Sequence, residues 1–187
     1  MNNILIVMAL EDEGQGLLEK LGFEVLYCGI GKVNAAYHLT RRLSDNLKPV
    51  AQVINLGSAG SHTFSTGKLV AADRFVQRDM DLTGLGFELG HTPYENEPMM
   101  ISIKRYFEHL PHGICGSGDS FLQDICPIHS DIIDMEAYAL AKVCSRELVP
   151  FACAKYITDG ADKSASNDWQ SNLKNAATSF LELLSER

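Results

Sequence analysis

The stretch "IIDMEAYALAKVC", residues 132–144, joins an apolar strand pattern to an apolar helix pattern and places Asp134 and Glu136 at the junction. Ionised carboxylates in apolar surroundings cost free energy unless they have partners or a chemical task. Both the fold and the function must therefore account for this pair.

Strand and helix patterns alternate on both sides of this junction. Apolar runs predict strands at 4–10, 23–29, 50–60, 68–76, 113–119, 131–135 and 150–159, with a glycine-rich turn closing the run at 50–60. Helical spacing predicts helices over 13–22, 136–148 and 33–43, where the spaced residues are Val33, Ala36, Tyr37 and Thr40. A C-terminal helix is predicted by an apolar stripe at Trp169, Leu173, Ala176, Phe180 and Leu184. The alternation predicts a single α/β domain over residues 1–187, in which helices flank a central mixed β-sheet.

The composition is that of a globular protein. Of its 187 residues, 45% are hydrophobic and 21% are charged, which excludes a disordered or fibrous chain. No apolar run approaches the roughly 20 residues of a membrane span, and no signal peptide is evident, so we expect a cytoplasmic protein without a membrane partner. The net charge of −8 and the absence of Lys/Arg runs argue against nucleic acid as a partner.

Cysteine and histidine give no sign of a metal or another cofactor. The five cysteines are scattered, with no CxxC pair and no histidine at zinc-ligand spacing. Buried free thiols are the expected state of such cysteines.

Polar clusters follow several of the predicted strands. They are "ALEDE" (9–13), "NLGSAG" (55–60), "GSGDSF" (116–121), "DMEA" (134–137) and "ITDGAD" (157–162). Ligands of open α/β sheets bind beyond the C-terminal ends of the strands, so these clusters form the candidate site. Each cluster alone also fits a tight turn or a helix N-cap, but together they gather several carboxylates and one serine at one rim.

The order of these motifs resembles the nucleoside phosphorylase and nucleosidase superfamily, most closely its methylthioadenosine/S-adenosylhomocysteine nucleosidases. "GIGKVNAA" (29–36) and "DRFVQRDMDLTGLGFELG" (73–90) extend the resemblance over residues 4–184. The resemblance implies a nucleoside phosphorylase-like fold, a small purine nucleoside as ligand, no cofactor, and a homodimer whose pockets borrow side chains from the neighbouring subunit.

It also implies cleavage of the N-glycosidic bond of a 5'-substituted adenosine-type nucleoside. That reaction needs a protonated leaving base, a stabilised oxocarbenium-like ribose and an activated water. Asp159 matches the general acid, Glu13 the residue that activates water, and Glu136 the anchor of the ribose hydroxyls. Apart from the resemblance, Glu13 and Asp159 fit ordinary first-turn and turn positions. Asp134 fits a ribose or base contact and a helix N-cap equally well.

The remaining implied residues surround the ligand. Ser58 would hold the water or a ribose hydroxyl, and Met135 would lie against the sugar. Phe121 would stack on the purine or else serve as a core aromatic, and backbone groups near Leu122 would bind the purine edge.

Leu82, Leu85 and Phe87 are implied as apolar walls around a 5'-alkylthio group. The exact base and 5' group are left open, and another 6-aminopurine nucleoside, futalosine or a nucleoside with a different 5' substituent is an alternative ligand.

The nucleophile decides between hydrolysis and phosphorolysis. Phosphorylases of the superfamily carry an arginine three residues before the serine that aligns with Ser58, and this chain has Asn55 there. Glu11, Asp12 and Glu13 would repel a phosphate dianion, so water is the predicted nucleophile. A phosphate-dependent phosphorylase and a catalytically weak nucleoside-binding module remain the alternatives.

Overall fold

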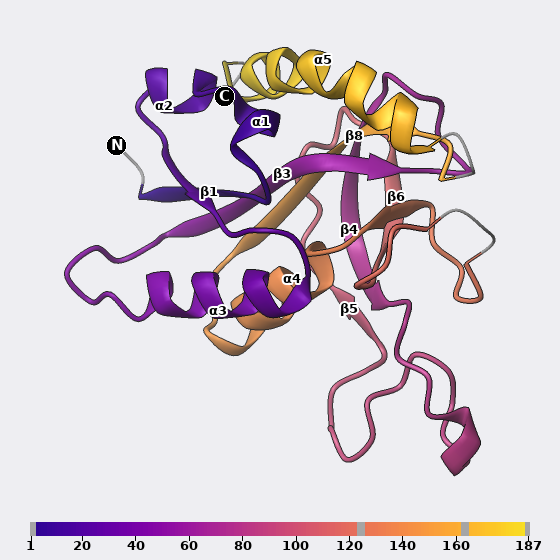
Figure 1. The fold of residues 1–187 in the computed structure, drawn as a ribbon. Helices are drawn as coiled ribbons and strands as arrows, with labels where there is room; N and C mark the ends of the chain where they lie inside the picture. The colour runs from indigo at the N-terminus through magenta and orange to yellow at the C-terminus, as the bar shows by residue number, and fades with distance from the viewer. Residues whose placement is uncertain (1–2, 123–125, 162–164, 186–187) are drawn as a thin grey trace.

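The strands form one mixed sheet (Figure 1). The computed structural model describes residues 3–122, 126–161 and 165–185. Within these ranges the strands are β1 (Ile4–Met8), β2 (Glu24–Tyr27), β3 (Gln52–Gly60), β4 (Leu69–Gln77), β5 (Met100–Ser102), β6 (His112–Ser117), β7 (Ile132–Asp134) and β8 (Phe151–Asp159). The three-residue β5, which pairs antiparallel with β4, was not predicted.

The helices agree with the predicted order, with one correction. They are α1 (Glu11–Gly14), α2 (Leu17–Lys20), α3 (Lys32–Leu43), α4 (Ala137–Arg146) and α5 (Ala165–Ser185), with a 3₁₀ turn η1 (Thr83–Leu85). The single helix predicted over 13–22 is wrong. Gln15 and Gly16 have φ angles of 49° and 66°, and this left-handed backbone separates α1 from α2.

The glycine-rich turn predicted after the third apolar run is also wrong, because residues 57–60 continue β3. This strand pairs in parallel with β8 from Val53 to Gly60. A Cβ atom at position 60 would lie 2.6 Å from Oδ1 of Asp159, so the site requires glycine there. Glycine is therefore needed here because neighbouring side chains lie close to the strand backbone, and not because the chain turns.

Part of the sheet closes on itself. The strand order is β2-β1-β3-β7-β6-β4-β5, and β8 pairs with both β3 and β4. As a result, β3, β8, β4, β6 and β7 make a closed ring of paired strands. At the end of β3, Gly60 pairs with Ile133 of β7 and with Asp159 of β8. This junction brings "DMEA" and "ITDGAD" together.

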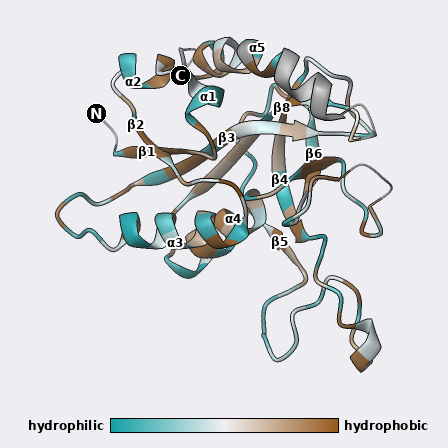
Figure 2. Ribbon diagram, viewed as in Figure 1, coloured by the Kyte–Doolittle hydropathy of each residue, from teal (hydrophilic) through white to brown (hydrophobic). Residues whose placement is uncertain are grey.

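Two apolar cores lie on opposite faces of the sheet. Along β1, Leu5 and Val7 join a core that includes α3 and α4, whereas Ile6 and Met8 join a core that includes α2 and α5. This alternation is the period of a β-strand. Figure 2 shows the apolar colour concentrated in the strands, with hydrophilic colour along α3.

The helix faces partly follow the predicted spacing. In α3 the buried side chains are Ala35 and Leu39, while Val33 and Tyr37 are exposed. The C-terminal stripe is confirmed at its buried members Leu173, Ala176, Phe180 and Leu184, and the side chain of Trp169 lies outside the described part.

Two further expectations can be compared with the structure. All five cysteines are free thiols, and four of them are buried. In the described ranges, none of the helices combines the length and the apolar character needed to cross a membrane.

Candidate active site

A cavity of about 110 Å³ lies at the C-terminal ends of β1, β3, β7 and β8. Predicted site residues in its lining are Glu13, Ser58, Phe121, Met135, Glu136 and Asp159. Leu122 lines a smaller cavity of about 30 Å³ that shares Phe121, Met135 and Asp159 with the first. The structure therefore brings the predicted carboxylates and the predicted base contacts to one place.

Glu13 is fixed by three hydrogen bonds at the start of α1. Oε1 accepts from the main-chain N–H and from Oγ of Ser58, both at 2.7 Å. Oε2 accepts from the N–H of Leu10 at 3.1 Å, which ties the side chain to its own helix start. Glu13 is only 3% exposed, so it is not the solvated first-turn glutamate of the alternative interpretation.

Glu136 precedes α4 and faces the same cavity. Its Oε1 accepts a 2.8 Å hydrogen bond from the N–H of Gly31, at the N-terminus of α3. Burial raises the pKa of Glu136 to about 7, and the negative charges of Asp134 and Glu13 act in the same direction. Lys155 and the Gly31 N–H act against this rise by favouring the ionised form. Glu136 thus changes charge near neutral pH.

Asp134, the last residue of β7, bonds to the first main-chain N–H of α4 and forms an ion pair with Lys155. Its Oδ2 accepts from the N–H of Ala137, the first residue of α4, at 2.9 Å, and lies 2.8 Å from Nζ of Lys155. Ser117 donates its hydroxyl to Oδ1. Burial works to raise the pKa of Asp134, but Lys155, Ser117 and the helix N–H outweigh it and lower the pKa. These contacts explain how an ionised carboxylate persists at the junction of strand and helix.

Asp159 ends β8 and is also buried, at 4% exposure. Oδ1 accepts from the N–H of Ala161, and Oδ2 accepts from the hydroxyl of Thr158, both at 2.9 Å. The hydrogen bonds hold this carboxyl group in the cavity wall beside Met135.

The turn after β6 carries the predicted base contacts. Phe121 lines the cavity and is 48% exposed, so it is not a core aromatic. Arg78 supports the turn, since its guanidinium donates to the carbonyl of Gly118 and to the hydroxyl of Ser120, both at 3.2 Å. The aromatic ring is therefore accessible to a ligand, while Arg78 holds the turn that precedes it.

The predicted 5' walls do not line this cavity. Leu82, Leu85 and Phe87 lie in the segment between β4 and β5, which projects from the body of the protein in Figure 1. Leu85 is 73% exposed, and the ring of Phe87 packs edge-on against Tyr94 within the same segment. Closer to β5, the same segment is held against α4 by ion pairs of Glu95 with Lys142 and of Glu97 with Arg146.

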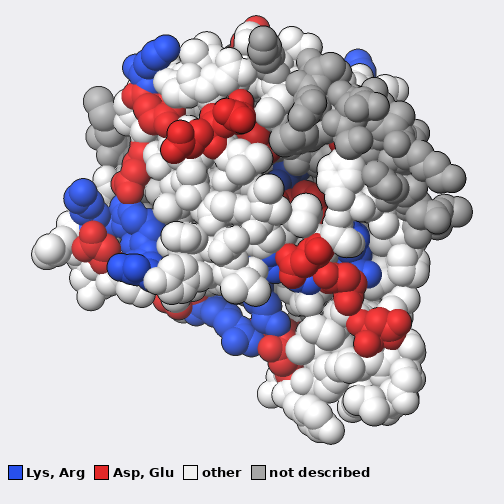
Figure 3. Space-filling model, in the orientation of Figure 1, with Lys and Arg blue, Asp and Glu red and all other residues white. Residues whose placement is uncertain are grey.

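Positive charge is absent from the described lining of the cavity of about 110 Å³, although Arg78 lines the adjoining smaller cavity. None of the described residues that line the first cavity is a lysine or arginine, and Lys155 behind it is paired with Asp134. Asn55 points into the sheet, where its amide donates to the carbonyl of Val7 at 3.0 Å. Acidic side chains over α1 form a red group on the face shown in Figure 3. Among the described residues, no cluster of His, Cys, Asp or Glu could hold a metal ion.

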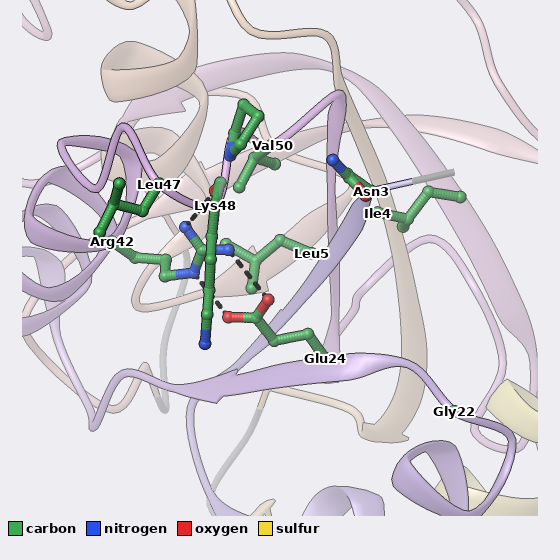
Figure 4. Close-up of a pocket in the computed structure, with 10 residues that line it drawn as sticks. Asn3, Ile4, Leu5, Gly22, Glu24, Arg42, Leu47, Lys48 and Val50 are labelled. Carbon is green, nitrogen blue, oxygen red and sulfur yellow. Dashed lines mark hydrogen bonds and ion pairs between the residues drawn. The ribbon is translucent and has the colours of Figure 1, made fainter. Parts of the chain in front are cut away.

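A larger cavity, of about 410 Å³, lies at the opposite end of β1. Two of its charged groups, Arg42 and Glu24, are paired with each other, because Arg42 donates to both carboxylate oxygens of Glu24, at 2.6 and 2.9 Å (Figure 4). The third contact of this guanidinium is the carbonyl of Lys48, at 2.9 Å. None of the predicted site motifs reaches this cavity.

Sequence comparison places the chain in a family. The sequence profile of the phosphorylase superfamily matches residues 16–186. The chain belongs to this superfamily. A 5'-methylthioadenosine/S-adenosylhomocysteine nucleosidase of Exiguobacterium is 32% identical over 191 aligned positions, which cover 91% of this chain and 81% of the relative.

Solved structures of two Helicobacter pylori enzymes share the fold. The nucleosidase of Helicobacter pylori with butyl-thio-DADMe-Immucillin-A superposes with a TM-score of 0.88 at 24% identity, covering 100% of this chain and 97% of that one. Futalosine hydrolase of Helicobacter pylori superposes with a TM-score of 0.87, also at 24% identity, over 98% and 96% of the two chains. The predicted α/β architecture with a central mixed sheet is confirmed.

Some contacts in this member of the phosphorylase superfamily could not be assigned from sequence. The roles of Arg78 and Gly31 depend on segments that meet only in the fold. Lys155 did leave a signal, because it is the one charged residue in the middle of the apolar run "FACAKYI" and therefore needed a buried partner.

Proposed function

We propose that the chain is a purine nucleosidase that hydrolyses the N-glycosidic bond of a 5'-substituted adenosine, of the methylthioadenosine/S-adenosylhomocysteine type. The observation that carries the proposal is the convergence of Glu13, Glu136 and Asp159 on one cavity. All three side chains are less than 10% exposed, although ionisable groups are seldom buried without a task. The nucleosidase relatives support the same reaction.

Glu13 is assigned to the attacking water. Its hydrogen bonds from the main-chain N–H and the hydroxyl of Ser58 fix the carboxylate beside the cavity. A water held beside this carboxylate would lose a proton to Glu13 as it attacks the anomeric carbon of the ribose.

Glu136 is assigned to the ribose. When ionised it accepts hydrogen bonds from sugar hydroxyls, and its charge favours the cationic sugar of the transition state over the neutral substrate. The Gly31 N–H and Lys155 both favour the ionised form that this role requires.

Asp159 is assigned to the leaving base. As a carboxylic acid it would deliver a proton to N7 of the purine, so that the base departs without negative charge. Phe121 is assigned to stack on that base, and the main chain near Leu122 is assigned to its edge.

Water is the proposed nucleophile rather than phosphate. The described cavity lining offers the four carboxylates of Glu13, Asp134, Glu136 and Asp159 and no cation, and a phosphate dianion at that place would be repelled.

We further propose that the functional form is a homodimer of this domain, residues 1–187. The cavity of about 110 Å³ is smaller than the roughly 300–1,000 Å³ of typical ligand sites and has no apolar wall from its own projecting segment. Leu82, Leu85 and Phe87 of a second copy would supply a wall for the 5' group. The cytoplasmic location stays a prediction.

Base release from a panel of nucleosides tests the reaction and the ligand. The panel contains methylthioadenosine, S-adenosylhomocysteine, adenosine, inosine and futalosine, each with and without phosphate. Adenine release from methylthioadenosine in phosphate-free buffer is the expected result. Formation of ribosyl phosphate with no turnover in phosphate-free buffer would show a phosphorylase, and nucleoside binding without turnover would show a binding module.

A further inference from the structure

Lys32 connects three segments that are distant in the sequence. It is the first residue of α3, and its side chain is only 14% exposed. Its ammonium group forms a hydrogen-bonded ion pair with Asp79, which follows β4, and lies 3.6 Å from Oδ2 of Asp119 in the turn after β6. None of the roles assigned above uses this lysine.

Main-chain hydrogen bonds complete the same network. The N–H of Lys32 donates to Oδ1 of Asp119, and the N–H of Asp119 donates to Oδ2 of Asp79, both at 2.8 Å. Burial works to raise the pKa of Asp79, but the bonds from Lys32 and Asp119 outweigh it and lower the pKa. Asp79 therefore stays ionised at neutral pH.

The network lies between the two sides of the proposed nucleoside site. Gly31, the residue before Lys32, donates to Glu136 on the ribose side. Asp119 is two residues before Phe121 on the base side. The ribose contact and the base contact are therefore each within two residues of a group that Lys32 carries or binds.

We propose that Lys32 is a positioning residue that fixes the turn bearing Phe121 against the turn bearing Gly31, and so sets the spacing between the base and ribose contacts. The inference rests on the proposed function, since it assumes that a nucleoside occupies the cavity. Lys32 itself touches neither the cavity nor the carboxylates that line it.

Electrostatics explains why a cation is needed at this point. The carboxylates of Asp79 and Asp119 are neighbours, because the ammonium group of Lys32 pairs with the first and lies 3.6 Å from the second. Without Lys32 they would repel each other, and this repulsion would push the turn of Phe121 away from the end of β4. Arg78 would still hold Gly118 and Ser120, so the expected result is a displaced turn in a folded protein.

The test compares Lys32→Met with Arg42→Met. Arg42 lies on the same helix, is also 14% exposed at its side chain, and has its own carboxylate partner at the remote cavity (Figure 4). Kinetics with methylthioadenosine and melting temperatures are measured for both variants. Lys32→Met should raise KM by about tenfold and lower kcat by less than about threefold, whereas Arg42→Met should change both by less than about twofold. Lys32→Arg keeps a cation at this position, so its KM should lie close to the wild-type value.

Two results would overturn the role of Lys32. One is a KM within about twofold of wild type in Lys32→Met, and the other is an equal rise in KM in Arg42→Met. If Lys32→Met does not fold, Lys32→Gln carries the same test, because it also removes the positive charge between Asp79 and Asp119 but keeps a polar group there. Failure of the proposed function would look different, because the wild-type protein would then release no base.

Discussion

The main-chain N–H of Gly31 donates a 2.8 Å hydrogen bond to Oε1 of Glu136, although 105 positions separate the two residues in the sequence. The bond places a helix N-terminus against the carboxylate assigned to the ribose, where partial positive charge favours the ionised form. Burial and the neighbouring Asp134 oppose it, with the result that the pKa of Glu136 is raised to about 7. Glu136 is therefore sensitive to pH in the range where the enzyme would work.

Nucleoside binding should weaken as the pH falls below this value. Protonation removes the charge that holds the sugar hydroxyls, so affinity should drop by about tenfold per pH unit below about 7 and level off above it. Calorimetric titration of methylthioadenosine into Asp159→Asn measures binding without turnover. Adding Glu136→Gln to that variant should flatten the pH profile; a profile that stays unchanged would assign the titration to another group.

Glu136→Gln should also stabilise the free protein at alkaline pH. The folded-state pKa, about 7, lies above the ordinary value of 4.5, so the folded state binds more protons between these pH values and stability falls as pH rises through them. At pH 8 the variant should be more stable than wild type by about 1–3 kcal/mol in urea unfolding. At pH 5 the difference should shrink, because Glu136 of the folded wild type is then largely protonated. A constant difference at both pH values would contradict the raised pKa.

Glu13→Gln tests the assignment of the base that activates water. The amide keeps the size and polarity of the side chain but cannot take a proton, so kcat should fall by about 10² or more while nucleoside affinity changes little. Glu11→Gln is the matched control, since Glu11 lies on the same helix and is exposed to solvent. Wild-type turnover in Glu13→Gln would remove Glu13 from the mechanism.

Asp159→Asn and Glu136→Gln should respond differently to the leaving group. The first variant cannot protonate the base, so a nitrophenyl riboside, which needs no protonation, should recover much of its lost rate. The second lacks the charge that favours the cationic sugar and should stay slow with both substrates. Equal recovery of the two variants would show that the assigned roles are wrong.

Lys155→Met should be among the most destabilising single substitutions in the protein. It removes the partner of a buried carboxylate and leaves Asp134 unpaired, which typically costs about 3–5 kcal/mol. Adding Asp134→Asn removes the uncompensated charge, so the double variant should recover a large part of the loss. Urea unfolding at pH 7 measures both; a double variant no more stable than Lys155→Met would show that the charge is not the cause.

Much of this architecture was readable from the sequence because buried strands have continuous apolar runs. The strand that ends at Asp159 and the helix that begins at Ala137 lie within a few residues of their predicted limits. The break at Gln15 was not readable, since glutamine carries no preference for a left-handed backbone. β5 was too short to produce a period of its own.

Several residues of the candidate site could be predicted from the sequence, but the hydrogen bonds between them could not. Glu13, Glu136 and Asp159 were predicted from the resemblance of their motifs to the phosphorylase superfamily, since their places beside apolar runs fit ordinary turn and helix-start positions as well. The hydrogen bond from Gly31 to Glu136 depends on the packing of α3 beside the ring of strands, and no local pattern records it. The position of Leu85 was likewise decided by the path of a projecting segment rather than by its own chemistry.

The closed ring of strands affects how the chain folds while the ribosome is still synthesising it. β8 comes last among the strands and inserts between β3 and β4, so both neighbours are synthesised long before their partner. Until Phe151–Asp159 has left the ribosome, the flanks of β3 and β4 expose unpaired main-chain groups to other chains. The nascent polypeptide is thus most prone to aggregate just before its last strand emerges. A premature stop before residue 151 would leave a product that lacks Asp159 and cannot close its sheet.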